Sequence, residues 1–185
     1  GAQPACTFLG KGPPSATTTQ EGLAVLTEIL TLRSSPSRLY RLINRVRAVT
    51  LAEDGASFVD VFHYLRDHGM GEDDAWSIAM RVFRGSTPDG KPFTKDLAYM
   101  RGFVQTYNFL RLAMSEGRLD SLPVLFCGKI TLTWRLLIDE GVVEAPRFVP
   151  PHFADLQGLA TWMSFSRFIA SLNFDQLQAD YGALL

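Results

Sequence analysis

A chain of 185 residues, of which 46% are hydrophobic and 11% aromatic, can bury a core of its own. Eighteen basic and nineteen acidic residues leave a net charge of −1, which excludes a global positive field for nucleic acid or an anionic membrane. Cys6 and Cys127 form no CxxC pair, and no apolar run reaches the ~20 residues of a membrane span. These features exclude a disulfide scaffold, a thiolate zinc site and a transmembrane protein, and they favour a cytoplasmic protein.

Two helix starts are predicted in the first part of the chain. Thr18 or Thr19 can cap a helix that begins at Gln20, because a side-chain oxygen there accepts a bond from a free amide of the first turn. Ser35 followed by Pro36 predicts the second start, since proline suits the first helical position.

The middle of the chain carries the same kind of signal. Ser57 and Asp60 have the spacing of a capping box ahead of FVDVFHYLRDHG, which Gly69 ends. The acidic residues 72–74 favour the start of another helix, which stops at Gly85.

The second half continues this pattern and completes the fold prediction. Thr94 can cap a long helix that runs to about Met114, after a tight turn with one short hairpin near residues 85–93 as an open alternative. Further helices are expected near residues 129–140, 153–171 and 174–181. The sequence therefore predicts a predominantly all-α, single helical domain over 1–185, with a loop over 1–19, a helical core over 20–145 and C-terminal helices over 146–185.

Two carboxylates lie in the otherwise apolar helix that begins near residue 20. Glu21 and Glu28 are seven residues apart, which places both on the same helix face. A carboxylate among apolar side chains is costly unless it is paired, hydrogen-bonded or bound to a metal. Glu21 is therefore a metal ligand or acid–base group, or a structural carboxylate satisfied by an arginine or by helix-end amides. Gly22 next to it permits a neighbouring element to approach closely.

Several segments in a fixed order resemble one protein family over essentially the whole chain. They are LGKGPPS, TQEGLAVLTE, DGASFVDVFHYL, RVFRG, PFTKDLAYMRG, LFCGKI and PRFVPP. On these segments the chain is identified as a member of the QEGLA-motif family, whose bacterial members are called flavohaemoglobin expression-modulating proteins. Eukaryotic relatives of that family include the microtubule-associated tyrosine carboxypeptidase. The resemblance implies a zincin-like zinc metallopeptidase, and a carboxypeptidase in particular.

The resemblance also implies a metal site. In the family an HExxxH helix supplies two histidine ligands and a general-base glutamate, and the glutamate of the EGLA helix, here Glu21, is the third ligand. Three protein ligands leave one position for a water whose pKa the zinc lowers. No HExxxH occurs in the 185 residues. The chain is therefore expected to be the C-terminal part of a longer protein, with that helix upstream of Gly1, and to be inactive alone. His63 and His68 point apart on a helix and are expected in surface or capping roles.

Two arginines are candidates for substrate binding. Arg81 and Arg84 in RVFRG are neighbours on one helix face and can clamp a substrate carboxylate, which a carboxypeptidase requires. The alternative is a salt bridge to an acidic residue such as Asp73 or Asp74.

Lys95 and Tyr99 lie one helical turn apart and can line the same cleft. The Tyr99 hydroxyl would then be a catalytic group that hydrogen-bonds the tetrahedral oxyanion near the zinc. The alternative is a structural tyrosine beside a solvated lysine.

An acid-free stretch between residues 33 and 47 contains Arg33, Arg38, Arg41, Arg45 and Arg47. Such a stripe can hold an acidic peptide, or it is a solvated helix face. The expected partners are a peptide or protein C-terminus as substrate, with no nucleic acid and no membrane. A homodimer through the surface left open by the missing HExxxH helix, around residues 20–32, is also expected. The second functional hypothesis is a non-catalytic helical interaction or regulatory module, in which Glu21 is structural.

Overall fold

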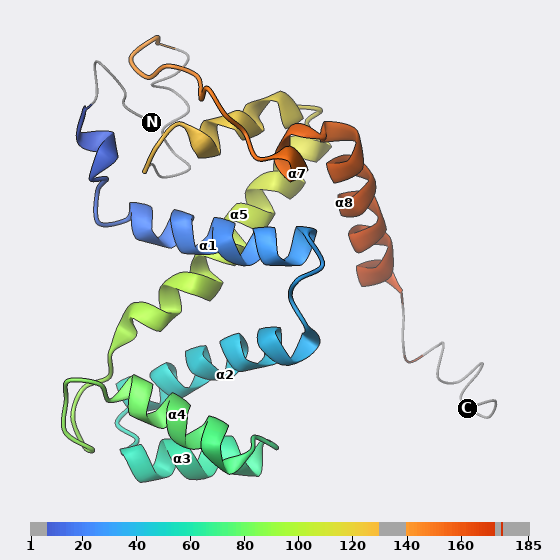
Figure 1. Cartoon of the computed structure of the whole chain (residues 1–185). Helices are drawn as coiled ribbons and strands as arrows, with labels where there is room; N and C mark the ends of the chain where they lie inside the picture. Colours follow the sequence, from blue (N-terminus) through green and yellow to red (C-terminus); the bar gives the residue numbers. More distant parts are fainter. Residues whose placement is uncertain (1–6, 130–139, 173–174, 176–185) are drawn as a thin grey trace.

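The computed structural model describes residues 7–129, 140–172 and 175, and in this part of the chain every regular element is a helix (Figure 1). The predominantly all-α prediction is therefore confirmed. The α-helices are α1 (Ala16–Leu30), α2 (Pro36–Glu53), α3 (Phe58–Asp67), α4 (Glu72–Val82), α5 (Leu97–Ser115), α7 (Pro151–Ala154) and α8 (Leu156–Ser171). Three 3-10 helices accompany them, namely η1 (Thr7–Gly10), η2 (Thr94–Asp96) and η3 (Leu119–Phe126).

Two of the predicted helix caps are confirmed by their hydrogen bonds. The Ser35 side chain accepts a bond from the Arg38 amide, with Pro36 in the first turn of α2. At α3 the Ser57 hydroxyl accepts from the Asp60 amide, and the Asp60 carboxylate accepts from the Ser57 amide. Both helices therefore begin where their capping residues predict.

The first helix begins earlier than predicted, and the cap assigned to Thr18 or Thr19 is wrong. Helix α1 starts at Ala16, with Ser15 at the N-cap position and no side-chain capping bond. Thr19 is 4% exposed inside the helix. Burial of this extra turn offsets the missing cap, because tertiary packing supplies most of the stability of a short helix.

Two hydrophobic cores divide the helices into an upper and a lower group in Figure 1. The upper core joins α1, α5, η3, α7 and α8 through buried residues that include Leu26, Leu110, Leu122, Phe153 and Met163. The lower core joins α2, α3 and α4 through buried residues that include Val49, Val61, Leu65, Ile78 and Val82. Helix α5 serves both groups, since Leu97 packs on the lower core and Leu110 lies in the upper one.

The segment between α4 and η2 forms turns, so the short hairpin considered near residues 85–93 is wrong. Two of its backbone bonds are local, from the Ser86 amide to the Phe83 carbonyl and from the Gly90 amide to the Thr87 carbonyl, and residues 85–93 contain no strand. A third bond, of 2.7 Å, joins the Phe58 amide at the start of α3 to the Pro88 carbonyl. A single bond of 2.7 Å from the Phe93 amide to the Val82 carbonyl returns the chain to the end of α4.

The later predictions are met in part. The helix expected over 153–171 is present as α7 and α8, with a break at Asp155, whose side chain caps α8 at the Gly158 amide. The helices expected near 129–140 and 174–181 fall almost wholly outside the described residues. Within the described part, no helix combines the length and the apolar character needed to cross a membrane.

Candidate functional site

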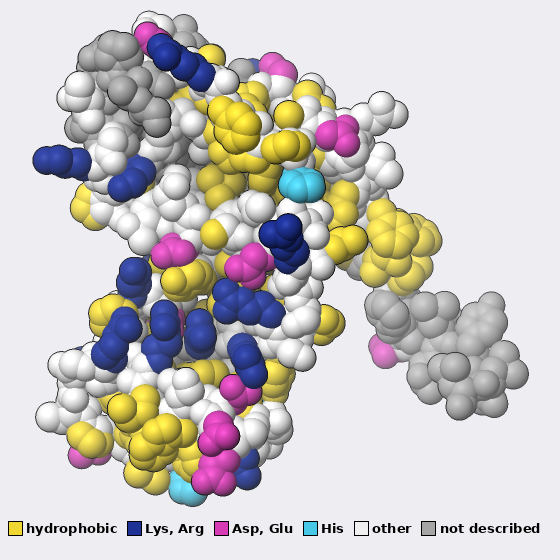
Figure 2. Space-filling model, viewed as in Figure 1, with side chains coloured by type: hydrophobic (Ala, Val, Ile, Leu, Met, Phe, Trp, Pro, Cys, Tyr) yellow, Lys and Arg dark blue, Asp and Glu magenta, His cyan; other side chains and the backbone are white. Residues whose placement is uncertain are grey.

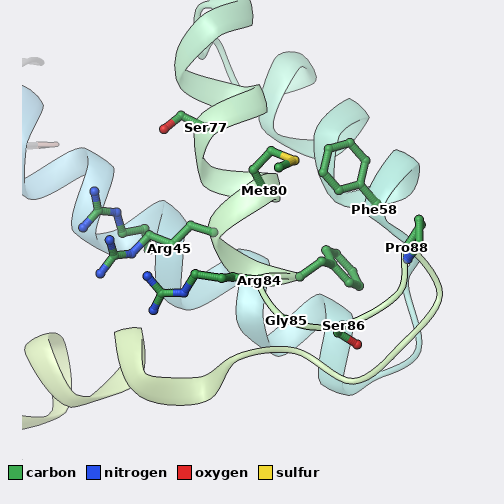
Figure 3. Close-up of a pocket in the computed structure, with 10 residues that line it drawn as sticks. Arg45, Phe58, Ser77, Met80, Arg84, Gly85, Ser86 and Pro88 are labelled. Atoms are coloured by element: carbon green, nitrogen blue, oxygen red, sulfur yellow. The ribbon is translucent and has the colours of Figure 1, made fainter.

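A pocket of about 560 Å³ opens where α2, α4 and the turn after α4 meet (Figure 3), and we call it the arginine pocket. Its lining is divided between cations and apolar side chains. The cations are Arg45, Arg81 and Arg84, and the apolar side chains are Phe58, Met80, Phe83 and Pro88. A site of this composition suits a ligand with an anionic end and an apolar body.

Helix spacing explains why these residues meet. Ser77, Met80, Arg81 and Arg84 are spaced by three and four residues, so they share one side of α4 and its C-terminal end. The opposite side of α4 is buried against α2 and α3. Arg45 reaches the pocket from α2, and Figure 3 shows Arg45 and Arg84 directing their guanidinium groups to the same side.

Arg81 has a carboxylate partner that the sequence did not suggest. Its Nε donates to Asp96 Oδ2 at 2.5 Å and its Nη2 donates to Asp96 Oδ1 at 2.7 Å. The hydrogen bond to Asp96 raises the pKa of Arg81, and the Tyr99 hydroxyl adds a smaller contribution in the same direction. The partner is thus Asp96 rather than Asp73 or Asp74, and Asp74 instead accepts from Arg41 at 2.7 Å.

Arg45 and Arg84 are the pocket cations without an ion-pair partner among the described residues, and Arg45 is the more buried of the two. The Arg45 side chain is half-buried, and its Nε is buried without a hydrogen bond. Burial lowers the pKa of Arg45, and the neighbouring Arg81 and Arg38 charges lower it further. A guanidinium still remains charged at neutral pH. An anion in the pocket would supply the hydrogen bond and the charge that Arg45 lacks.

Of the other residues predicted to bind substrate or to act in catalysis, Arg84 lines the pocket, whereas Tyr99 and Lys95 do not. The Arg84 guanidinium stacks 4.2 Å from the centre of the Phe93 ring and is exposed at the pocket mouth. Tyr99 is half-buried on α5 and contributes to the raised pKa of Arg81, so it lies close to the same group. Lys95 is exposed on η2 and does not line the pocket.

The two carboxylates of α1 have different surroundings. Glu28 accepts from Arg38 Nε at 3.2 Å and from Nη2 at 3.3 Å, which compensates its charge. Glu21 is half-buried and has no ion pair among the described residues. In Figure 2 basic side chains gather over α2, in the hollow below α1. The arginine stripe of α2 is therefore partly neutralised, at Arg38 and Arg41, and partly free.

The described residues do not complete a zinc site. No group of three or more His, Cys, Asp or Glu side chains in residues 7–129, 140–172 and 175 is arranged to hold a metal ion. His68 ends α3, where its ring stacks on Tyr64 at 4.0 Å between centres and contacts the Tyr64 carbonyl. His63 lies edge-on to Phe62. Both histidines have the local roles expected from their positions.

Sequence reasoning missed Asp96 and did not separate Arg45 from the other arginines of α2. The available signals were weak: Asp96 lies next to Lys95 in a segment already considered, and Arg45 stands in an acid-free stripe. Which arginine is left without a partner depends on the packing of α2 against α4 and η2, and spacing along the chain does not contain that information.

The comparisons with known proteins identify one family. No curated protein sequence and no solved structure matches the chain significantly. One family model does match, and its description is microtubule-associated tyrosine carboxypeptidase. The match extends over residues 1–171 and therefore includes every residue of the arginine pocket as well as Glu21. The chain belongs to the microtubule-associated tyrosine carboxypeptidase family.

Proposed function

We propose that the chain binds the free C-terminus of a peptide or protein in the arginine pocket, as part of a carboxypeptidase-type function. The observation that carries the proposal is Arg45, a half-buried cation with an unbonded Nε and no ion-pair partner among the described residues. A carboxylate binds a guanidinium through charge-assisted hydrogen bonds, which are stronger than neutral ones. A carboxypeptidase needs such a group because its substrates are defined by their terminal carboxylate.

The apolar side of the pocket supports a large terminal side chain. Phe58 packs edge-on against Trp76 at 5.0 Å between ring centres, and Met80 is exposed beside it. An aromatic residue with its carboxylate on Arg45 could place its ring against this wall, since aromatic and methionine side chains favour aromatic neighbours. The family description names tyrosine as the released residue, and we propose tyrosine as the terminal residue that this chain prefers.

A pair of peptides tests the proposal directly. One is a short blocked peptide that ends in tyrosine with a free carboxylate, and the other is the same peptide with a C-terminal amide. We expect the chain to bind the free acid about tenfold or more tightly, because the amide removes the charge. Isothermal titration calorimetry measures both affinities.

A matched pair of variants locates the binding. Arg45→Met should remove most of the preference for the free acid. Arg47→Met removes the same charge from the same helix, but at an exposed position outside the pocket, and should preserve the preference. Equal affinity of the unmodified chain for both peptides would refute the proposal, and an equal effect of the two variants would refute the assignment to Arg45.

We also propose that catalysis requires zinc and that Glu21 is one of its ligands. Support comes from the family and from the half-buried Glu21, which has no ion pair among the described residues. Because no HExxxH occurs in the 185 residues, the two histidine ligands and the general base of this proposal would come from another part of the protein. The 185 residues by themselves should therefore lack peptidase activity.

Metal content decides between this proposal and the alternative. Zinc should be retained after dialysis only by a longer version that includes the HExxxH helix, and Glu21→Ala should release it. If neither version retains zinc, a non-catalytic interaction or regulatory module is the better description.

Two further expectations stay predictions. A homodimer through residues 20–32 would use the exposed part of α1 and its end, where Leu32 is 86% exposed. Sedimentation equilibrium checks it, and a monomer at all concentrations would contradict it. A cytoplasmic location is checked by fractionation of cells that express the full protein.

A further inference from the structure

Asp96 is a buried carboxylate at the junction of η2 and α5. It is 3% exposed and occupies the N-cap position of α5, where an aspartate normally accepts a bond from a backbone amide. Here the side chain makes no capping bond, and both of its oxygens accept from Arg81 instead. The Asp96 carboxylate therefore bonds to Arg81 of α4 in place of a backbone amide of its own helix.

We propose that Asp96 is the positioning residue of the arginine pocket: it fixes the Arg81 guanidinium so that its free edge and Arg45 together receive a peptide carboxylate. This inference rests on the proposed function. It goes further because it assigns a role to a residue that does not line the pocket and acts through Arg81.

Hydrogen-bond geometry supports this role. A guanidinium carries five N–H donors in a rigid plane. Asp96 engages Nε and Nη2 of Arg81, at 2.5 and 2.7 Å, which leaves the remaining donors facing away from Asp96. A two-point contact fixes the plane as well as the position of the group.

Charge supports it as well. Arg45, Arg81 and Arg84 line one pocket, and Asp96 is the acidic partner of this group. Its charge partly offsets the repulsion that Arg45 experiences from Arg81. Without Asp96 the repulsion between the Arg45 and Arg81 guanidinium groups would be uncompensated, and Arg81 would lose the contact that fixes its plane. Asp96 therefore keeps the cations close together while Arg45 remains free to bind.

The readout is the ratio of affinities for the free-acid and amide forms of the tyrosine-ending peptide. Asp96→Asn keeps the size of the side chain but removes its charge, and should lower that ratio about tenfold. Asp96→Glu keeps the carboxylate and should recover part of the ratio. Asp89→Asn removes an exposed carboxylate from the turn before η2 and should leave the ratio unchanged.

The ratio separates positioning from a structural role, because lost stability alone lowers the affinity for both peptides equally. An Asp96→Asn chain that is folded and keeps the wild-type ratio would overturn the inference while leaving the proposed function intact. If Asp96→Asn does not fold, Arg81→Lys decides. Lysine keeps the charge but cannot make the two-point contact, so the ratio should again fall, and an unchanged ratio would overturn the inference. A wild-type chain without any preference would overturn the proposed function and this inference together.

Discussion

Gly22 of α1 and Gly102 of α5 pack backbone against backbone where the two helices cross. A Cβ atom on Gly22 would lie 2.1 Å from the carbonyl carbon of Gly102, and one on Gly102 would lie 1.9 Å from the carbonyl oxygen of Thr18. Such distances leave no room for any side chain. Because Gly22 follows Glu21 and Gly102 lies one turn after Tyr99, this crossing fixes the helix that carries Glu21 relative to the helix that carries Tyr99.

The first prediction concerns this crossing. Gly22→Ala should lower the free energy of unfolding by about 3 kcal/mol, the upper end of ordinary overpacking costs, or prevent folding. This should happen although alanine gains about 1 kcal/mol in helix propensity over glycine. Urea denaturation followed by circular dichroism measures it. Gly10→Ala is the control, since a Cβ there meets no atom within 4 Å. Equal stability of both variants would contradict the crossing.

The second prediction concerns the ion pair between α1 and α2. Glu28 and Arg38 are each about one-third exposed, with side-chain values of 36%. Glu28→Gln should therefore cost less than about 1 kcal/mol, and the cost should shrink in high salt. A double-mutant cycle with Arg38→Gln measures the coupling. A larger coupling that salt does not reduce would show that the pair is more buried than its exposure indicates.

The third prediction concerns the stability of the empty arginine pocket. Arg45→Met removes a half-buried charge that lies close to Arg81 and Arg38. The free energy of unfolding should be unchanged or rise by up to about 1 kcal/mol, because a desolvated, unpaired cation is replaced by an apolar side chain. Thermal unfolding in the absence of peptide measures the change. A marked loss of stability would mean that Arg45 holds the fold and is not held ready for a ligand.

The fourth prediction concerns acid stability at the start of α3. The Ser57 hydroxyl and amide donate to Asp60 and lower the pKa of its carboxyl below the ordinary 3.8. A carboxyl group whose pKa is lower in the folded than in the unfolded state stabilises the protein at pH values above its unfolded-state pKa. This contribution is lost as the pH falls through the folded-state pKa. Unfolding measured from neutral pH down to below pH 3.8 should show a shallower loss of stability for Asp60→Asn than for wild type. An identical acid dependence would contradict the capping-box contribution.

Local sequence signals determined a large part of the fold. The Ser35–Pro36 start and the Ser57–Asp60 box were predicted correctly because each depends on atoms within one helical turn. Gly22 was correctly expected to allow close approach, since a missing side chain is visible in any sequence. The tight turn expected over 87–92 is present, but the start of α1 and the short hairpin considered over 85–93 were predicted wrongly. Burial of Thr19 and the return of Phe93 to Val82 join parts of the molecule that local rules do not compare.

For the candidate site, too, the sequence determined one part and the tertiary structure another. The sequence by itself determined which residues could carry charge into it, namely the arginines of RVFRG, the stripe over residues 33–47 and the acidic side chains of α1. Only the tertiary structure decided how these charges pair: Glu28 with Arg38, Arg41 with Asp74, and Arg81 with Asp96, with Arg45 left unpaired in the described part of the chain. The physical reason is that an ion pair between helices forms across distances of about 3 Å, which are set by helix packing and not by separation along the chain.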